Sequence, residues 1–232
     1  MSSFVVSTLT CPKCQREFEA GTAESLNVTR MPWAREQILA GHFHRVTCAH
    51  CGTESHLERD FLYTDLARGH FVMVHGTQEI GRWQELEERA AQTYHETLAT
   101  GPSRAYELTA RFALRVVFGL RGLADKLRVW DAGLDDGVVE LVKLDLFQAT
   151  PELRTRAELQ LGVTAVDDEA RRLEIEAWSL TGERPSTWYG ASLARYHELA
   201  AARVELEERF PGLFNRPFVC WRRLANERVV GA

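Results

Sequence analysis

The sequence lacks the features that would place the protein in a membrane, in the secretory pathway or on a nucleic acid. No stretch of its 232 residues approaches the roughly 18 consecutive apolar residues that a membrane-spanning helix needs. Residues 1–10 carry neither the basic segment nor the apolar segment of a secretory signal. The net charge of −5 is not the basic excess of a dedicated nucleic-acid binder. We therefore expect a cytoplasmic protein with no membrane partner.

Low-complexity segments and internal repeats are missing as well. The composition, 45% hydrophobic and 26% charged, is that of an ordinary globular protein. A chain of this length buries roughly 70% of its unfolded surface, so it can build a core without disulfides. The length fits one large domain or two small ones.

Cysteine is scarce, and four of the five cysteines lie in two closely spaced pairs. The pairs are CPKC at 11–14 and CAHC at 48–51, which gives the pattern C-x2-C-x33-C-x2-C. Two such pairs form the ligand set of a tetrahedral zinc site, because each short loop directs two thiolates at one ion. Cytoplasmic thiols stay reduced, which also favours a metal over disulfides. We predict one structural Zn²⁺ with four ligands, Cys11, Cys14, Cys48 and Cys51.

Two other interpretations of the cysteine pairs remain open. A thioredoxin-like redox pair places its first cysteine at the N-terminus of a helix, whereas the residues around Phe18 predict a short strand after CPKC. A histidine, either His42, His44 or His50, could replace one cysteine ligand. Because four thiolates already complete a tetrahedral site, we expect these histidines at the surface or behind the ligands.

Residues 1–76 predict a zinc ribbon with a helical insertion. Apolar residues indicate strands over 4–10 and 43–48, each leading into a cysteine pair, and a hairpin over 61–75. A helix over 31–40 fills the gap between the pairs. Each cysteine pair should therefore lie at the tip of a hairpin.

Residues 77–232 predict a larger mixed domain. Helical spacing and strand alternation indicate these elements in chain order: a helix over 78–98 capped by Thr77, a strand over 111–119, a helix over 120–133, a helix capped by Asp135 or Asp136, a β-hairpin near 158–178 and a helix over 191–209. The segment FVCWRRL at 218–224 fits either a strand or a helix. The expected fold class is α+β, with the N-terminal four-cysteine ribbon joined to this larger domain.

The CPKC and CAHC motifs, the helix-sized insert and the following FLYTD segment resemble the bacterial CpXC protein family. The similarity covers residues 9–76 and extends into the segment RVVFGLRGLADKLRVWDAGLDD. The resemblance implies metal binding by the same four cysteines. The second motif has Ala49 where the first has a proline, which removes rigidity but no ligand. The family brings no established biochemical activity with it.

No other motif forms a convincing catalytic set, so we predict no catalytic residue. The His-Leu-Glu at 56–58 follows the cysteines, the reverse of the zinc-deaminase order, and His197-Glu198 lacks the second histidine of a zinc protease motif. The glycines at 119 and 122 match no phosphate loop. Helix capping explains a group of carboxylates as well as catalysis does: Asp131, Asp135, Asp136 and Glu140.

A run of basic residues interleaved with aromatic residues could form a groove that binds single-stranded nucleic acid through charge and stacking. Its basic members are Arg111, Arg115, Arg121, Lys126 and Arg128. The negative net charge favours the other interpretation, in which the aromatic residues are core and the basic residues line solvated edges.

We expect a non-enzymatic structural-zinc protein that acts in bacteria as an adaptor or regulatory module and binds another protein, with a homo-oligomer also compatible. The first alternative is a zinc ribbon that binds nucleic acid, which steep salt dependence would reveal. The second is an enzyme with a site in residues 77–232, which polar groups converging on a deep pocket would reveal. Cys220, in the apolar segment PFVCW, is expected to be an inert buried thiol.

Overall fold

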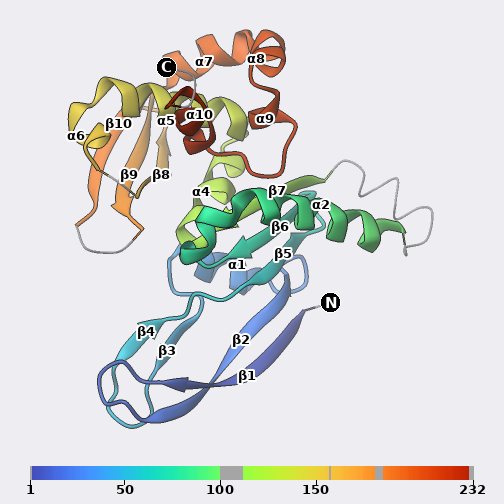
Figure 1. Ribbon diagram of the computed structural model, residues 1–232, viewed down its shortest axis with the longest axis vertical. Helices are drawn as coiled ribbons and strands as arrows, with labels where there is room; N and C mark the ends of the chain where they lie inside the picture. The colour runs from blue at the N-terminus through green and yellow to red at the C-terminus, as the bar shows by residue number, and fades with distance from the viewer. Residues whose placement is uncertain (1, 100–111, 157, 181–184, 230–232) are drawn as a thin grey trace. The chain divides into compact units, whose positions relative to one another are not determined.

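The computed structural model describes residues 2–99, 112–156, 158–180 and 185–229 (Figure 1). The chain divides into two compact units, Met1–Leu123 and Ala124–Ala232. Helices and strands are mixed along the chain, so the predicted α+β class is confirmed. No helix among the described residues is both long and apolar enough to cross a membrane.

The first unit contains a five-stranded sheet in the order β1-β2-β5-β6-β7. Its strands are β1 (Ser3–Thr10), β2 (Glu17–Asn27), β5 (Phe61–Asp65), β6 (His70–His75) and β7 (Ala113–Phe118). Strand β7 pairs in parallel with β6, so a segment beyond residue 76 completes the sheet that the earlier strands begin. The unit ends at Leu123, inside helix α4 (Gly119–Asp131), and not at residue 76. Parallel pairing joins segments far apart in the chain and leaves no local trace in the sequence.

Strand β2 connects the cysteine hairpin to the rest of the sheet. It is longer than the short strand that the sequence predicts and runs through Gly21 to Asn27. Most of β2 pairs antiparallel with β1, and only its last three residues, Ser25–Asn27, pair in parallel with β5. The hairpin of β1 and β2 therefore extends away from β5, β6 and β7 (Figure 1).

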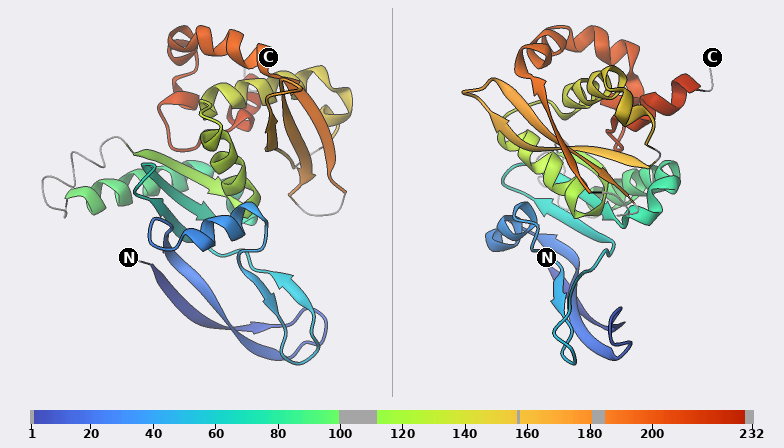
Figure 2. Two further views of the ribbon diagram at one scale, coloured as in Figure 1. Left: turned by 180° about the vertical axis from the view of Figure 1, so that it is seen from behind. Right: turned by 90° about the vertical axis from the view of Figure 1, so that its left-hand side faces the viewer.

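Helices α1 (Pro32–Leu39) and α2 (Trp83–Ala99) lie on opposite faces of this sheet (Figures 1 and 2). Pro32 occupies the first turn of α1, where its missing amide hydrogen costs no helix hydrogen bond. On α2, Tyr94 packs edge-on against Phe71 of β6 with 5.0 Å between ring centroids. The two helices therefore cover opposite faces of the sheet.

The predicted cap at Thr77 is wrong. A 3-10 helix, η1 (Thr77–Arg82), precedes α2, which begins only at Trp83. The amide of Thr77 donates to a Glu58 side-chain oxygen at 2.8 Å, and its hydroxyl donates to the same oxygen. Because the Thr77 hydroxyl donates its hydrogen bond to Glu58, Thr77 connects η1 to the loop before β5 and does not cap a helix.

The second unit contains a three-stranded antiparallel sheet in the order β10-β9-β8. Its strands are β8 (Leu159–Asp167), β9 (Arg172–Ser179) and β10 (Thr187–Ser192). The hairpin near 158–178 is therefore confirmed, but β10 was not predicted. The short uncharged segment of β10 gave no alternating pattern strong enough to find it.

The helices of the second unit follow α4 in chain order: α5 (Asp136–Ala149), α6 (Pro151–Arg154), α7 (Leu193–Ala201), α8 (Arg203–Arg209), α9 (Pro211–Phe214) and α10 (Trp221–Val229). The predicted cap at Asp135 is confirmed, because its carboxylate accepts from the amide of Val138 at 3.1 Å. The helix expected over 191–209 is interrupted at Ala202. The ambiguous segment at 218–224 enters helix α10 at Trp221.

Candidate metal centre

Cys11 and Cys14 lie in the tight turn between β1 and β2. The Cys11 amide donates to the carbonyl of Arg16 at 2.9 Å, and the Cys11 carbonyl accepts from the amide of Gln15 at 3.0 Å. Gln15 adopts a φ of 58°, in the left-handed region. These bonds fold the chain back on itself directly after the strand and bring the two thiols together.

Cys48 and Cys51 lie in the equivalent turn between β3 (Arg45–Thr47) and β4 (Glu54–His56). The Cys48 amide donates to the carbonyl of Thr53 at 2.9 Å, and the Cys48 carbonyl accepts from the amide of Gly52 at 2.9 Å. Gly52 has a φ of 69°, which glycine adopts without strain. Both turns thus have the same hydrogen bonds at the same offsets from their first cysteine, and both pairs lie at hairpin tips as predicted.

The two turns bring all four sulfur atoms within 4.8 Å of one another. The Sγ atoms of Cys11 and Cys51 are 3.6 Å apart, and those of Cys14 and Cys48 are 3.7 Å apart. A tetrahedral site with zinc–sulfur bonds of about 2.3 Å places its sulfur atoms about 3.8 Å apart. All four cysteines are free thiols, and a disulfide would need a separation of about 2.05 Å. The four cysteines can therefore hold one tetrahedral metal ion.

The thiols in this cluster differ in acidity. Hydrogen bonding with the Thr53 side chain, whose Oγ1 lies 3.3 Å from the Cys51 sulfur, and with the Thr53 backbone lowers the pKa of Cys51 to about 6. The backbone of Arg16 acts in the same direction on Cys14, but desolvation and the three neighbouring thiols raise its pKa to about 11. Thiols this close cannot all ionise without a cation, and a divalent ion would relieve their repulsion.

Histidines take no part in the metal-ligand group that the described residues form. His44 is buried, and its Nε2 accepts from the Ala23 amide at 3.0 Å. Burial, together with the charge of Arg59, lowers the pKa of His44 to about 4. The His50 ring donates from Nε2 to the Glu17 carbonyl at 2.9 Å, which fastens the second cysteine turn to β2. His42 also lies outside the group, so no histidine takes the place of a cysteine.

A second cluster, which the sequence did not reveal, is buried in the second unit. It consists of five charged residues with at most 5% exposure: Asp125, Lys126, Asp136, Glu140 and Lys143. Lys143 Nζ donates to Asp125 Oδ2 at 2.7 Å and to Glu140 Oε1 at 2.8 Å. Lys126 Nζ donates to the same Glu140 oxygen at 2.8 Å and lies 3.5 Å from Asp136 Oδ2. We call this group the buried ion network.

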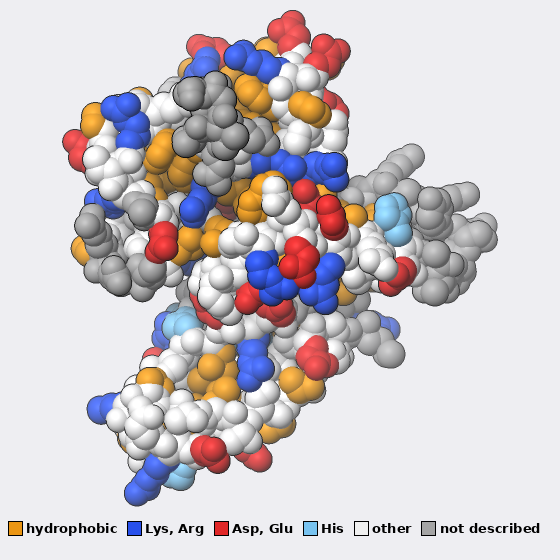
Figure 3. All heavy atoms as spheres, viewed as in Figure 1, with side chains coloured by type: hydrophobic (Ala, Val, Ile, Leu, Met, Phe, Trp, Pro, Cys, Tyr) orange, Lys and Arg blue, Asp and Glu red, His pale blue; other side chains and the backbone are white. Residues whose placement is uncertain are grey.

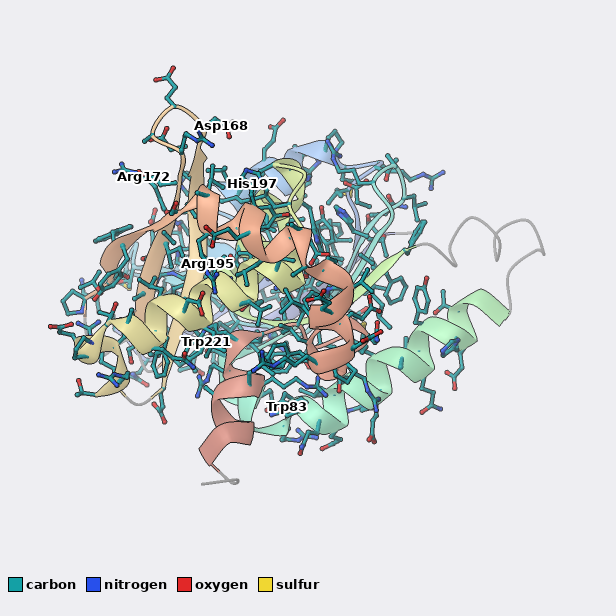
Figure 4. The ribbon with its side chains drawn as sticks, turned by 90° about the horizontal axis from the view of Figure 1, so that it is seen from above. Trp83, Asp168, Arg172, Arg195, His197 and Trp221 are labelled. Carbon is teal, nitrogen blue, oxygen red and sulfur yellow. The ribbon has the colours of Figure 1, made fainter. Side chains whose placement is uncertain are left out.

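The buried ion network also binds backbone amides of other elements. Asp125 Oδ1 accepts from the Val163 amide at 2.6 Å, where β8 is irregular. Glu140 Oε2 accepts from the Trp221 amide at 2.9 Å, at the start of α10, which packs against α5 (Figure 4). Two carboxylates therefore each bind a lysine with one oxygen and a backbone amide with the other. Charged residues on a helix ordinarily lie on its solvent-exposed face, so the sequence did not indicate this network.

The carboxylates and basic residues that the sequence analysis considered as possible functional groups do not form a separate site. Asp136 and Glu140 belong to the buried ion network, and Asp131 is the last residue of α4 and not near a helix start. The basic run is not a single exposed strip, because Lys126 is buried and Arg128, part-buried, donates to the Val163 carbonyl at 3.4 Å. Arg111 lies outside the described residues. Cys220 is buried as predicted, and burial raises its pKa to about 12.

Comparison with known proteins identifies one family. The model of the family described as CpXC protein matches residues 9–143, which is more than half of the chain. The matched segment contains both cysteine turns and extends into α5. Neither the curated proteins nor the solved structures contain a match to the chain.

Proposed function

The chain belongs to the CpXC family, and from this premise we propose that its four cysteines hold one structural zinc ion and that the hairpins joined by this ion form a protein-binding module. The observation that carries the proposal is the group of four sulfur atoms, which all lie within 4.8 Å of one another and include two separations of 3.6 and 3.7 Å. Tetrahedral sites with four sulfur ligands suit zinc or iron. Zinc is the ion that such paired cysteine loops bind in ribbons.

A structural role follows from the completeness of the ligand set. A catalytic zinc site keeps one coordination position for water or substrate, whereas four thiolates occupy every position. The sulfur contacts join the first turn to the second, Cys11 to Cys51 and Cys14 to Cys48. The ion would therefore cross-link two hairpins and activate no water. This supports a structural role for the ion.

Protein binding is favoured by apolar side chains at the surface of the first unit. Four large hydrophobic residues of this unit are between 45% and 71% exposed: Phe4, Val6, Trp33 and Leu66. Figure 3 shows hydrophobic side chains at the surface of the cysteine hairpins, between charged ones. Exposed apolar groups suit a protein partner, and the net charge of −5 does not suit a polyanion. The partner would be another protein, and the module would act as an adaptor or regulatory element.

The test of the metal is elemental analysis of untagged full-length protein beside two variants. We expect one zinc ion per chain in the wild type, none or a small fraction in Cys48→Ser, and one again in Cys220→Ala. The second variant is the matched control, because it removes the one cysteine outside the cluster. A wild-type chain without metal, or a Cys48→Ser variant with full zinc occupancy, would contradict the proposal.

The test of the partner class is binding to single-stranded DNA and RNA at low salt. The proposal predicts no binding, because nucleic-acid contacts made through phosphates are strongest at low ionic strength. Affinity that appears at low salt and falls steeply as salt is added would instead support the nucleic-acid alternative.

A further inference from the structure

Strand β1 is an unprotected edge of the five-stranded sheet. Among the described residues it pairs only with β2, and it stands at the end of the sheet order. None of its eight residues is buried, and five of them are exposed. One row of backbone amides and carbonyls along β1 therefore faces away from the sheet and can pair with another strand.

The composition of β1 is unusual for such an edge. Its sequence, SFVVSTLT, contains no charged residue and no proline. Proteins commonly protect exposed edges with lysine, proline, bulges or short strands, because long apolar edges invite pairing. Valine, threonine and phenylalanine are also residues with high strand propensity. Phe4 is 47% exposed and Val6 is 71% exposed, on the same face of the strand.

Both ends of β1 are fixed, which makes the strand a rigid template. At its beginning, the Ser2 hydroxyl accepts from the Asn27 amide at 2.9 Å, and the Ser3 amide donates to the Ser25 hydroxyl at 3.2 Å. At its end, Thr10 is followed directly by Cys11 of the cysteine cluster. A strand that is already ordered loses little conformational entropy when a second strand pairs with it.

We propose that β1 pairs antiparallel with β1 of a second copy of this chain, about a two-fold axis near Val6. This inference rests on the proposed function and names the partner of the module. A two-fold axis places Val6 beside Val6 of the other copy and Phe4 beside Thr8, all on one face of the joined sheet. Cross-strand pairs of aromatic and β-branched residues of this kind stabilise sheets.

The absence of charge on β1 is the argument for a second copy. Two-fold pairing brings each strand against itself, so a charged residue near the axis would face a like charge. β1 carries none, whereas β2 beside it carries three glutamates, Glu17, Glu19 and Glu24. β1 is therefore uncharged along its whole length, so two copies can pair without placing like charges opposite each other.

The experiment measures the mass of the full-length chain by sedimentation over a concentration series. The wild type is expected to approach twice the chain mass of 26.4 kDa as concentration rises. Val6→Lys is expected to remain a monomer, because the pairing places two lysines side by side. The matched control is Val204→Lys on α8, which makes the same change at the same 71% exposure and should leave the dimer intact.

A mixture of two variants separates loss of pairing from loss of folding. Val6→Glu alone should also be monomeric, whereas Val6→Lys mixed with Val6→Glu should form a heterodimer, since opposite charges then meet at the axis. A wild type that stays monomeric at every concentration overturns the proposal. So does a Val6→Lys variant that dimerises as well as Val204→Lys.

Zinc content measured on the same samples distinguishes this inference from the proposed function. A monomeric wild type with one zinc ion overturns strand pairing and leaves the metal centre standing. A dimer that Val6→Lys abolishes, in a chain without zinc, supports strand pairing and overturns the metal centre.

Discussion

The cysteine hairpins and the buried ion network both join separate segments of the chain, but they differ in how much buried core surrounds them. Strands β3 and β4 have three residues each, and only the middle residue of each is even half-buried. The second unit, which contains the network, instead has fully buried apolar residues such as Leu127, Val163 and Ile175, which are at most 1% exposed. The second unit therefore has a core and buried charges of its own, whereas in the proposed function an ion from solution joins the hairpins.

The largest expected effect is the loss of the metal from the hairpins. Cys48→Ser removes one of four ligands, and structural zinc contributes about 10 to 16 kcal/mol of apparent binding energy in zinc-finger peptides. We expect amide hydrogen exchange over β1–β4 to become fast while β8 and β9 keep their protection. Equal protection of β1–β4 and of β8 and β9 in Cys48→Ser would contradict the claim that only the hairpins depend on the ion.

The next effect concerns the buried ion network. Lys143→Met removes the cation that both Asp125 and Glu140 bind, and breaking one partner of a buried charge group costs about 3 to 5 kcal/mol. Urea unfolding, followed by the protection of β8 and β9, measures this loss. The control is Arg195→Ala, which breaks ion pairs exposed to solvent and should cost no more than about 1 kcal/mol. Equal losses of unfolding free energy in the two variants would mean that the buried network contributes no more to stability than a solvent-exposed ion pair.

A smaller effect comes from two strand glycines, one in each region. A Cβ added at Gly162 would lie 2.8 Å from two ring atoms of Trp178, so Gly162→Ala should lower the free energy of unfolding by about 1 to 3 kcal/mol. At Gly21 a Cβ would meet nothing within 4 Å, so Gly21→Ala should be neutral or stabilising by up to about 1 kcal/mol. Thermal unfolding of both variants tests the contrast. A tolerated Gly162→Ala would show that Trp178 packs loosely.

The smallest effect is a dependence on alkaline pH in the second unit. Burial raises the pKa of Cys220 to about 12, so the folded state keeps this proton above pH 9 while the unfolded state releases it. Stability from this thiol is therefore complete below pH 9 and falls as pH rises, by up to about 1.4 kcal/mol per pH unit. Urea unfolding between pH 8 and 10 should show a shallower loss for Cys220→Ala than for the wild type. Identical slopes would contradict the assignment.

The sequence predicted the cysteine site better than the rest of the fold, for a physical reason. Two CxxC pairs encode a local turn each, so Cys11 and Cys48 could be placed at hairpin tips without knowing the overall topology. The pairing of β6 with β7, in contrast, is formed across the intervening helix α2 and depends on tertiary packing. Lys126 and Lys143 were unpredictable for a similar reason. A charged residue on a helix is normally solvated, and only the convergence of Asp125 and Glu140 makes burial tolerable.

The most direct test of the account is a count of reactive thiols in the native protein at pH 8, before and after a zinc chelator and then after denaturation. Zinc release is recorded in the same cuvette. We predict that the native protein resists modification, that the chelator releases one zinc ion and exposes four thiols, and that Cys220 reacts only after denaturation. All five thiols reacting together, or four thiols reacting without any chelator, would contradict the claim that a metal ion holds the hairpins independently of the second unit.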